Sequence, residues 1–218
     1  MTVVRGRLIA LEGIDGCGKS TQVRLLAERL GAVATFEPGA TALGKSLRAL
    51  LLDRQEAPVS TRAEALLMAA DRAQHVTDVI VPALESGQWV VTDRYSPSTL
   101  AYQGFGRGLD REVLEALVGW ATAGLRPDLT VLFDVPVLVA ASRRSGAADR
   151  MEAEGEAFLQ RVADGYLTLA AESAESEERW LVVDATGTVE AIAETIWEAV
   201  EALAGVDGPP TSGPGVNP

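Results

Sequence analysis

Short apolar runs alternate with amphipathic stretches along most of this chain. Runs typical of buried strands lie at Leu8–Leu11, Ala32–Phe36, Trp89–Thr92, Leu129–Val135 and Trp180–Val183. Between the runs, apolar residues recur at helical spacing: Val23, Leu26 and Leu30 form one such stripe, and Gly31 ends it. Strands that are separated by helices predict a parallel sheet with helices on both faces, and hence an α/β fold.

Several helix boundaries carry signals of their own. Thr61 and Glu64 have the spacing of a capping box, which predicts that a long helix begins there and runs through Ala73 and beyond. Pro82 is expected to kink or restart this helix, because proline lacks the amide hydrogen that a helix interior needs. Further helices are predicted over Lys19–Leu30, Leu43–Leu52, Asp110–Ala123, Phe158–Ala171 and Thr188–Leu203, and another begins at Pro136.

The segment Gly13–Ser20 matches the P-loop pattern, in which glycines let consecutive backbone N–H groups turn toward phosphate oxygens. It stands between a predicted strand and a predicted helix, which is the context that this loop requires. Lys19 is expected to reach the β- and γ-phosphates, and the Ser20 hydroxyl to bind Mg²⁺. The predicted ATP-binding residues are Gly13, Ile14, Asp15, Gly16, Cys17, Gly18, Lys19, Ser20 and Thr21.

The overall composition narrows the possible functions. The chain has 218 residues, which suits a single domain, and its formal net charge is −12. So acidic a surface repels nucleic acids and anionic membranes, and neither partner is expected. No apolar stretch reaches the ~18 residues of a membrane span and no signal peptide is recognised, so we expect a cytoplasmic location. One cysteine and one histidine, Cys17 and His75, argue against disulfides and Cys- or His-rich metal sites.

A second group of charged residues is predicted to bind the phosphate group of an acceptor substrate. Asp93, Arg94 and Tyr95 follow a predicted strand directly, and ligands of open α/β sheets bind at the carboxyl ends of strands. Further candidates are Glu37, Arg48 and Arg72, with Arg143, Arg144 and Arg150 in a stretch rich in Gly, Ser and Ala. A phosphate acceptor is already largely a dianion near neutral pH, so it needs arginines rather than a catalytic base. His75 is therefore expected to serve packing or the surface rather than chemistry.

Taken in order, these motifs resemble those of the thymidylate kinase family, P-loop enzymes that make dTDP from dTMP and ATP. The resemblance covers about residues 7–204 and rests on segments 12–21, 37–39, 47–48, 69–72, 93–95, 101–104, 127–130, 149–150 and 184–186. It implies a five-stranded parallel sheet of order 2-3-1-4-5, a lid at about residues 142–152 and a homodimer. The tail 205–218, rich in Gly and Pro, is predicted to be disordered.

The resemblance also implies a role for each acceptor-site residue. Asp15 would accept the 3′-hydroxyl of dTMP, and Arg94 and Arg48 would hold its phosphate. Arg72 would donate to thymine O4, which rejects cytosine because cytosine has an amino group there. Tyr102 would crowd out a 2′-hydroxyl. Glu37, Met68, Thr99 and Gln103 complete the predicted dTMP site, and Asp93 joins Ser20 near Mg²⁺.

Two positions set this chain apart within the family pattern. Gly16 leaves the P-loop without a basic residue, so the catalytic arginines are expected in the lid, with Arg144 and Arg150 favoured over Arg143. Met68 stands where an aromatic residue usually stacks on thymine, and Phe36 where many members have an arginine. The predicted catalytic residues are Lys19, Arg94, Arg144, Arg150 and Asp15.

Two other functions remain open at this stage. The chain could be a kinase for another nucleoside monophosphate on the same fold. It could also be a module that senses ATP without transferring a phosphoryl group. A small GTPase is disfavoured, because the chain has no Asn-Lys-x-Asp motif for guanine.

Overall fold

The computed structural model describes residues 4–53, 58–144, 149–174 and 178–205. Its elements are β1 (Leu8–Glu12), α1 (Lys19–Leu30), β2 (Val33–Phe36), α2 (Ala42–Leu52), α3 (Thr61–His75), η1 (Val76–Ile80), α4 (Val81–Glu85), β3 (Val90–Asp93), α5 (Ser96–Thr99), η2 (Leu100–Gly106), α6 (Arg111–Ala121), β4 (Leu129–Asp134), α7 (Val137–Arg143), η3 (Glu152–Glu154), α8 (Glu156–Ser173), β5 (Trp180–Asp184) and α9 (Val189–Ala204).

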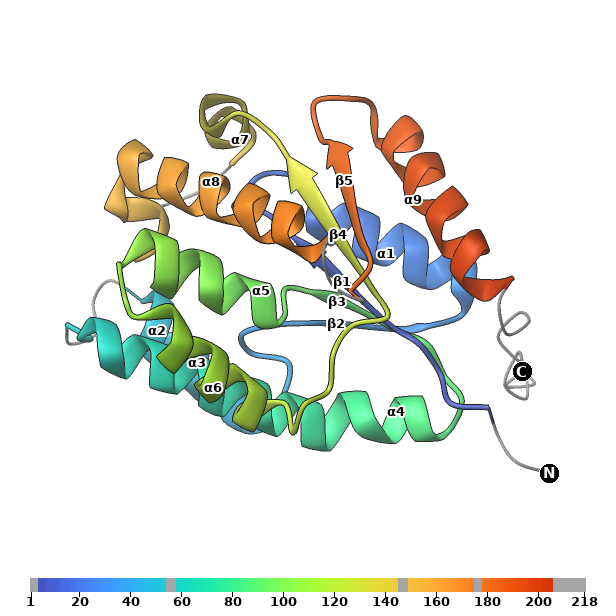
Figure 1. The fold of residues 1–218 in the computed structure, drawn as a ribbon, viewed down its shortest axis with the longest axis horizontal. Coiled ribbons are helices and arrows are strands. Elements are labelled where there is room, and N and C mark those ends of the chain that lie inside the picture. The colour runs from blue at the N-terminus through green and yellow to red at the C-terminus, as the bar shows by residue number, and fades with distance from the viewer. Residues whose placement is uncertain (1–3, 54–57, 145–148, 175–177, 206–218) are drawn as a thin grey trace.

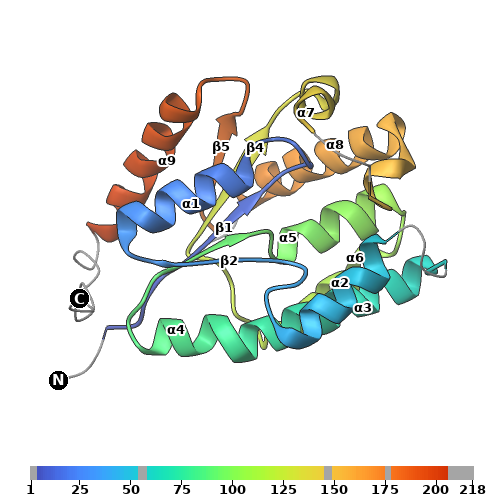
Figure 2. The same ribbon diagram turned by 180° about the vertical axis from the view of Figure 1, so that it is seen from behind.

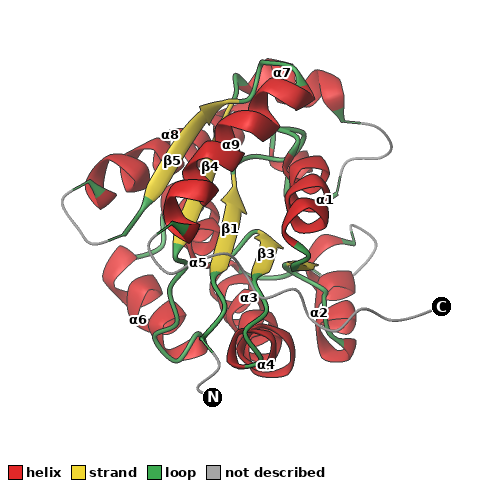
Figure 3. Ribbon diagram, turned by 90° about the vertical axis from the view of Figure 1, so that its right-hand side faces the viewer, coloured by secondary structure: helices red, strands yellow, loops and turns green. Residues whose placement is uncertain are grey.

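The strands form one parallel sheet in the order β2-β3-β1-β4-β5, as the resemblance implies. Helices enclose this sheet on both sides (Figure 3). Helices α1 and α9 pack side by side on the face seen in Figure 2, and α8 packs against β4 and β5 from the other face (Figure 1). The α/β prediction is therefore confirmed.

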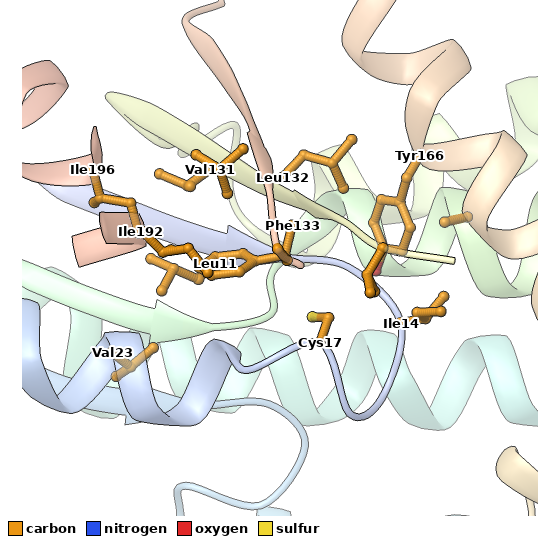
Figure 4. Packing of buried hydrophobic residues seen from close by; sticks show 14 of the residues in the cluster. Leu11, Ile14, Cys17, Val23, Val131, Leu132, Phe133, Tyr166, Ile192 and Ile196 are labelled. Atoms are coloured by element: carbon orange, nitrogen blue, oxygen red, sulfur yellow. The ribbon is translucent and has the colours of Figure 1, made fainter. Parts of the chain in front are cut away.

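Alternate side chains of β1 enter two different parts of the core. Ile9 and Leu11 pack with Val23 of α1 and Ile196 of α9, all of them buried (Figure 4). Leu8 and its neighbours on that side pack with the buried residues of η1 and α4 instead. Central strands of a parallel sheet are covered on both faces, and this is why β1 reads as a continuous apolar run.

The strand register brings three loops together at one edge of the sheet. Leu11 of β1 stands beside Asp93 of β3, and Asp93 beside Phe36 of β2. Backbone hydrogen bonds continue this pairing past the strand ends, from Arg94 N to Leu11 O (2.9 Å) and from Glu37 N to Asp93 O (2.9 Å). The P-loop, the Asp93–Tyr95 turn and the Glu37–Gly39 turn therefore lie side by side.

The predicted capping box at Thr61 is wrong. Ser60 is the N-cap of α3, and its hydroxyl accepts a hydrogen bond from Ala63 N at 3.4 Å. Glu64 does not fold back to the helix end; its side chain is buried inside the protein. A serine directly before the threonine satisfies the first amide groups equally well, and this left Glu64 available for another role.

Other boundaries agree with the sequence to within a few residues. The helix that begins as α3 passes through η1, a wide π-helical turn, and restarts as α4 with Pro82 in its first turn. Asp110 and Thr188 cap α6 and α9 through their side chains. The segment α5–η2, which no sequence signal predicted, lies between β3 and α6. Almost all of the proposed tail, residues 206–218, and residues 145–148 of the proposed lid are outside the described part of the chain.

Candidate active site

The P-loop curls between β1 and α1 with its glycines in conformations that suit only glycine. The φ angles are 140° at Gly13, 88° at Gly16 and 102° at Gly18. Ile14 and Cys17 turn inward, where Figure 4 shows them among the core side chains, and both are buried. These two apolar side chains fix the loop to the core, so the backbone N–H groups of the loop lie on its outer side, toward the start of α1.

Lys19 lies across the inside of this loop. Its Nζ donates to Gly13 O and Ile14 O, both at 3.1 Å, and stands 3.5 Å from Cys17 Sγ. Asp93 Oδ1 is 3.9 Å from the same ammonium group. Two backbone carbonyl groups of the loop thus hold the ammonium group of Lys19 inside it.

Ser20 and Asp93 form an oxygen-rich corner beside Lys19. The Ser20 hydroxyl donates to Asp93 Oδ2 at 2.7 Å. The described residues contain no cluster of three or more His, Cys, Asp or Glu side chains that could enclose a metal ion. Mg²⁺ is bound in kinases by one or two protein oxygens together with phosphates, so this corner fits Mg²⁺ and not a metal that needs a full protein cage.

A pocket opens between the P-loop, α2, α3 and η2. All nine predicted acceptor residues line it: Asp15, Glu37, Arg48, Met68, Arg72, Arg94, Thr99, Tyr102 and Gln103. A neighbouring depression, lined by Ser20 and Asp93, shares Asp15, Arg94, Glu37 and Arg48 with it. The two hollows therefore adjoin each other at these four side chains.

Arg94 stands at this junction in a constrained conformation. Its backbone has a φ of 76°, which is rare for a residue other than glycine and is found mostly where a side chain must be aimed. Its guanidinium donates to Asp15 at 2.7 Å and to the hydroxyls of Tyr102, Ser98 and Tyr166 at 3.0–3.1 Å. Four partners from three parts of the chain hold the positive charge in one orientation.

Behind Arg94 lies a buried carboxylate that sequence reasoning did not single out. Glu12 accepts from Tyr95 N at 2.7 Å and from the hydroxyls of Ser98 at 2.6 Å and Tyr166 at 2.9 Å. Burial raises the pKa of Glu12, whereas these hydrogen bonds and the charge of Arg94 lower it. Glu12 therefore supports the two hydroxyls that contact Arg94.

Asp15 connects the P-loop to the acceptor pocket. Besides Arg94, it accepts a hydrogen bond from the Tyr102 hydroxyl at 3.1 Å. Burial acts to raise the pKa of Asp15, but the positive charges of Arg94 and Lys19 outweigh it and hold the pKa well below its usual value. An ionised carboxylate at this position can accept a hydrogen bond from a ligand hydroxyl.

At the inner end of the pocket, Arg72 is fixed by three acceptors. It donates to Glu37 at 2.8 Å, Thr99 Oγ1 at 2.7 Å and Tyr95 O at 2.8 Å, and it is only 2% exposed. The other oxygen of Glu37 contacts His75 Nδ1 at 2.8 Å, while His75 Nε2 contacts Thr35 Oγ1 at 2.6 Å. His75 is fully buried, so of the two expected roles, packing or the surface, the structure excludes the surface; the ring packs behind Glu37 and contacts its carboxylate.

The α5–η2 segment supplies much of the pocket wall. Ser98, Thr99, Tyr102 and Gln103 all line the pocket from it. The chain changes from α-helical to π-helical geometry at Leu100. Wide π turns of this kind occur often at functional sites, because they alter which side chains share a face.

The predicted lid arginines reach different partners in this structure. Arg143 donates to Ala185 O at 2.7 Å, and Arg150 donates to Asp53 O at 2.7 Å, at the end of α2. Arg144 follows α7 and stands next to the P-loop, since a Cβ atom added to Gly16 would lie 3.0 Å from Arg144 Cγ. Of the three, Arg144 is the one that the described residues place against the phosphate loop.

Comparisons with known proteins agree with this arrangement. The family model "Thymidylate kinase" matches residues 11–196. A thymidylate kinase of Synechococcus sp. (strain CC9902) is 51% identical over 203 residues, which are 88% of this chain and 95% of that protein. One from Cupriavidus necator is 46% identical over 209 residues, covering 92% of this chain and all of the relative.

The chain belongs to the thymidylate kinase family. A solved structure agrees as well: the thymidylate kinase of Ehrlichia chaffeensis superposes with a TM-score of 0.73 at 30% identity, and covers 90% of this chain and 99% of that one. The pocket also contains six residues to which the sequence analysis gave no role: Pro38, Leu52, Asp71, Ser98, Asp149 and Met151. Pro38, Asp71 and Asp149 lie inside the motif segments 37–39, 69–72 and 149–150, so the motifs were the available signal for these three.

Proposed function

We propose that this member of the thymidylate kinase family transfers the γ-phosphoryl group of ATP to dTMP and releases dTDP and ADP. The observation that carries the proposal is the junction at Arg94 and Asp15, which belong both to the acceptor pocket and to the depression beside Ser20 and Asp93. Two phosphorylated substrates that enter from opposite sides would meet there. No membrane-spanning helix is found among the described residues.

Phosphoryl transfer to a phosphate acceptor requires positive charges and alignment of the two substrates, and it requires no catalytic base. The acceptor phosphate is largely a dianion near neutral pH, so it attacks without losing a proton to the protein. Arg94 and Arg48 would hold this phosphate in line, and Lys19 and Arg144 would neutralise charge that develops on the transferred group. The buried setting of Arg94 strengthens such contacts, because water does not compete for them.

Mg²⁺ is proposed as the cofactor, held through Ser20 and Asp93. Bound with ATP, the ion neutralises charge on the phosphate oxygens. The hydroxyl and the carboxylate already lie within hydrogen-bond distance of each other, at 2.7 Å. The protein's part is to fix these two oxygens next to Lys19.

In the acceptor pocket, the polar side chains would contact the sugar and the base of dTMP. Asp15 would accept the 3′-hydroxyl, and Tyr102 would fill the space of a 2′-hydroxyl. Burial raises the pKa of Tyr102 far above its ordinary value, so its hydroxyl stays protonated and donates to Asp15. Met68 would cover the base, and Arg72, Thr99 and Gln103 would contact its edge.

The deciding experiment is ADP release with and without dTMP. We expect ADP to form only when ATP, Mg²⁺ and dTMP are all present, with dTDP produced in equal amount. ADP release that does not depend on dTMP would contradict the proposal, as would a preference for dCMP, dGMP or AMP as acceptor. The same assay thus also tests the two alternative functions.

A homodimer that works in the cytoplasm is also proposed. The free thiol of Cys17 suits a reducing compartment. Helices α2, α3 and α6 lie side by side (Figures 1 and 2) and expose apolar side chains on their outer surfaces: Leu43, Leu50, Leu66, Val113 and Trp120. Trp120 is 83% exposed, and large exposed apolar groups of this kind mark interfaces.

Sedimentation of Trp120→Asp tests the dimer. We expect the wild type to sediment as a dimer and the variant as a monomer. Leu138→Asp, at an exposed leucine on α7, is the matched control and should remain dimeric. A wild type that is monomeric at micromolar concentration would contradict the proposal.

A further inference from the structure

The side-chain amide of Gln103 is fixed from behind by Glu64. Gln103 Nε2 donates to Glu64 Oε1 at 2.9 Å, and both side chains are almost fully buried. The guanidinium of Arg107 contacts the same carboxylate at 3.2 Å through Nε and at 3.0 Å through Nη2. A carboxylate that is paired with an arginine only accepts hydrogen bonds, so the amide nitrogen of Gln103 must face it.

The opposite end of this amide is therefore a carbonyl oxygen. Gln103 lines the acceptor pocket, and within the described part of the chain its Oε1 has no hydrogen-bond partner. Arg72 lines the same pocket, and its terminal nitrogens each carry a second N–H beyond the ones given to Thr99 and Tyr95. The pocket thus offers an acceptor from Gln103 and donors from Arg72.

This pair of groups matches one class of base. Thymine and uracil carry a carbonyl oxygen at C4 next to an N–H at N3, so the first takes a donor and the second an acceptor. Cytosine has an amino group at C4 and an unprotonated N3, which reverses both positions. If the Gln103 amide were turned over, the pocket would present donors to both positions and would lose its preference.

We propose that Glu64 is a positioning residue that determines which base the acceptor site takes. Its carboxylate holds the Gln103 amide with the carbonyl oxygen toward the base. It thereby selects bases with a ring N–H beside a carbonyl group. This inference rests on the proposed function, because it concerns the acceptor of that same reaction.

The surroundings of Glu64 provide a matched control. Arg107 also pairs with Glu154 of η3, at 2.6 Å, and lies over the Phe158 ring at 4.8 Å. Glu154→Gln therefore removes one carboxylate from Arg107 but leaves the Glu64–Gln103 contact in place. Glu64→Gln replaces the strict acceptor with an amide, which can pair with the Gln103 amide in either orientation.

The experiment measures kcat/KM for dTMP and for dCMP at saturating ATP and Mg²⁺. We expect Glu64→Gln to lower the ratio of dTMP to dCMP by at least ~10-fold, because sites built on hydrogen bonds owe large discrimination to them. Glu154→Gln should leave the ratio unchanged. An equal loss for both acceptors in Glu64→Gln would overturn the proposal, since it would show that Glu64 only stabilises the fold.

A double-mutant cycle with Gln103→Met tests whether Glu64 acts through the Gln103 amide. In that background Glu64→Gln should no longer change the ratio; an undiminished effect would show that Glu64 acts elsewhere and overturn the proposal. If Glu64→Gln does not fold, Glu64→Ala, which removes the carboxylate from behind the Gln103 amide, is measured with the same expectations. Turnover of dTMP by the wild type tests the proposed function separately, since it does not depend on any variant.

Discussion

A Cβ atom added to Gly16 of the P-loop would lie 2.3 Å from the carbonyl oxygen of Ala140 in α7. Backbone atoms of a helix cannot swing aside as a flexible side chain can, so no side chain fits between the loop and α7 as they are packed here. The loop therefore has no room for a basic residue at this position. Arg144, which follows α7, is the arginine packed against the loop at this position, and we propose that it adds its charge to that of Lys19.

Gly16→Ala is expected to destabilise the protein well beyond the usual effect of an alanine at positive φ. The left-handed backbone alone costs roughly 1–2 kcal/mol, and the clash with Ala140 adds about 1–3 kcal/mol of overpacking. Gly18→Ala is the control: its φ is also positive, at 102°, but nothing lies within 4 Å of the added atom. Thermal unfolding of the ligand-free proteins should show the larger drop in Tm for Gly16→Ala. Equal drops would mean that α7 does not press on the loop.

Arg94→Lys should reduce turnover even though it keeps the charge. The Arg94 guanidinium contacts Asp15, Ser98, Tyr102 and Tyr166 at once, and a lysine ammonium cannot reproduce that planar set. We expect kcat/KM for dTMP to fall by about 100-fold or more, with the KM for ATP nearly unchanged. Arg126→Lys, at an exposed arginine paired with Glu178, should behave like the wild type. Near-normal turnover in Arg94→Lys would remove Arg94 from the proposed site.

Much of the fold followed from local pattern. The buried strands are continuous apolar runs, and Asp110 and Thr188, where two helices were predicted to begin, cap α6 and α9. The α5–η2 segment escaped prediction because its residues face the pocket and α8 rather than one apolar stripe. Gly106 and Gly165 allow the close approach behind it, since a Cβ atom on either would lie under 3 Å from an aromatic ring.

The candidate site also contains residues that could be predicted from the sequence and residues that could not. Residues that the family pattern indicates could be named beforehand, and all nine residues predicted for the acceptor site line one pocket. The contacts that hold them could not be predicted. Glu12 lies inside the motif segment 12–21, but no local pattern shows that it contacts Ser98 and Tyr166. Glu64 has the spacing of a helix cap, which is a local signal that the buried ion pair with Arg107 overrides.

The stability of this protein should depend on pH through Asp71. Burial and the nearby negative charge of Glu37 raise the pKa of Asp71 to about 6 in the folded state. The unfolded chain releases this proton near the ordinary aspartate pKa of ~3.9. Between those values the folded state binds more protons than the unfolded state. The free energy of unfolding contributed by Asp71 is therefore highest below about pH 4 and falls as the pH rises toward 6.

Asp71→Asn should remove this dependence. The amide oxygen can still accept from Gly39 N, which contacts Asp71 Oδ1 at 3.0 Å in the wild type. Urea unfolding at pH 5 and pH 8 should show that the wild type loses about 1 kcal/mol more than the variant over this interval. The same loss in both proteins would show that another group titrates.

Met68→Phe is expected to tighten the binding of dTMP. Met68 lines the acceptor pocket, where a thioether offers the base less flat surface than an aromatic ring does. An aromatic stack adds about 0.5–1.5 kcal/mol beyond the area that it buries, so the dissociation constant should fall by roughly 2- to 13-fold. Titration calorimetry with dTMP measures this, and deoxyribose 5-phosphate, which lacks the base, should bind both proteins equally. Unchanged affinity for dTMP would show that Met68 does not face the base.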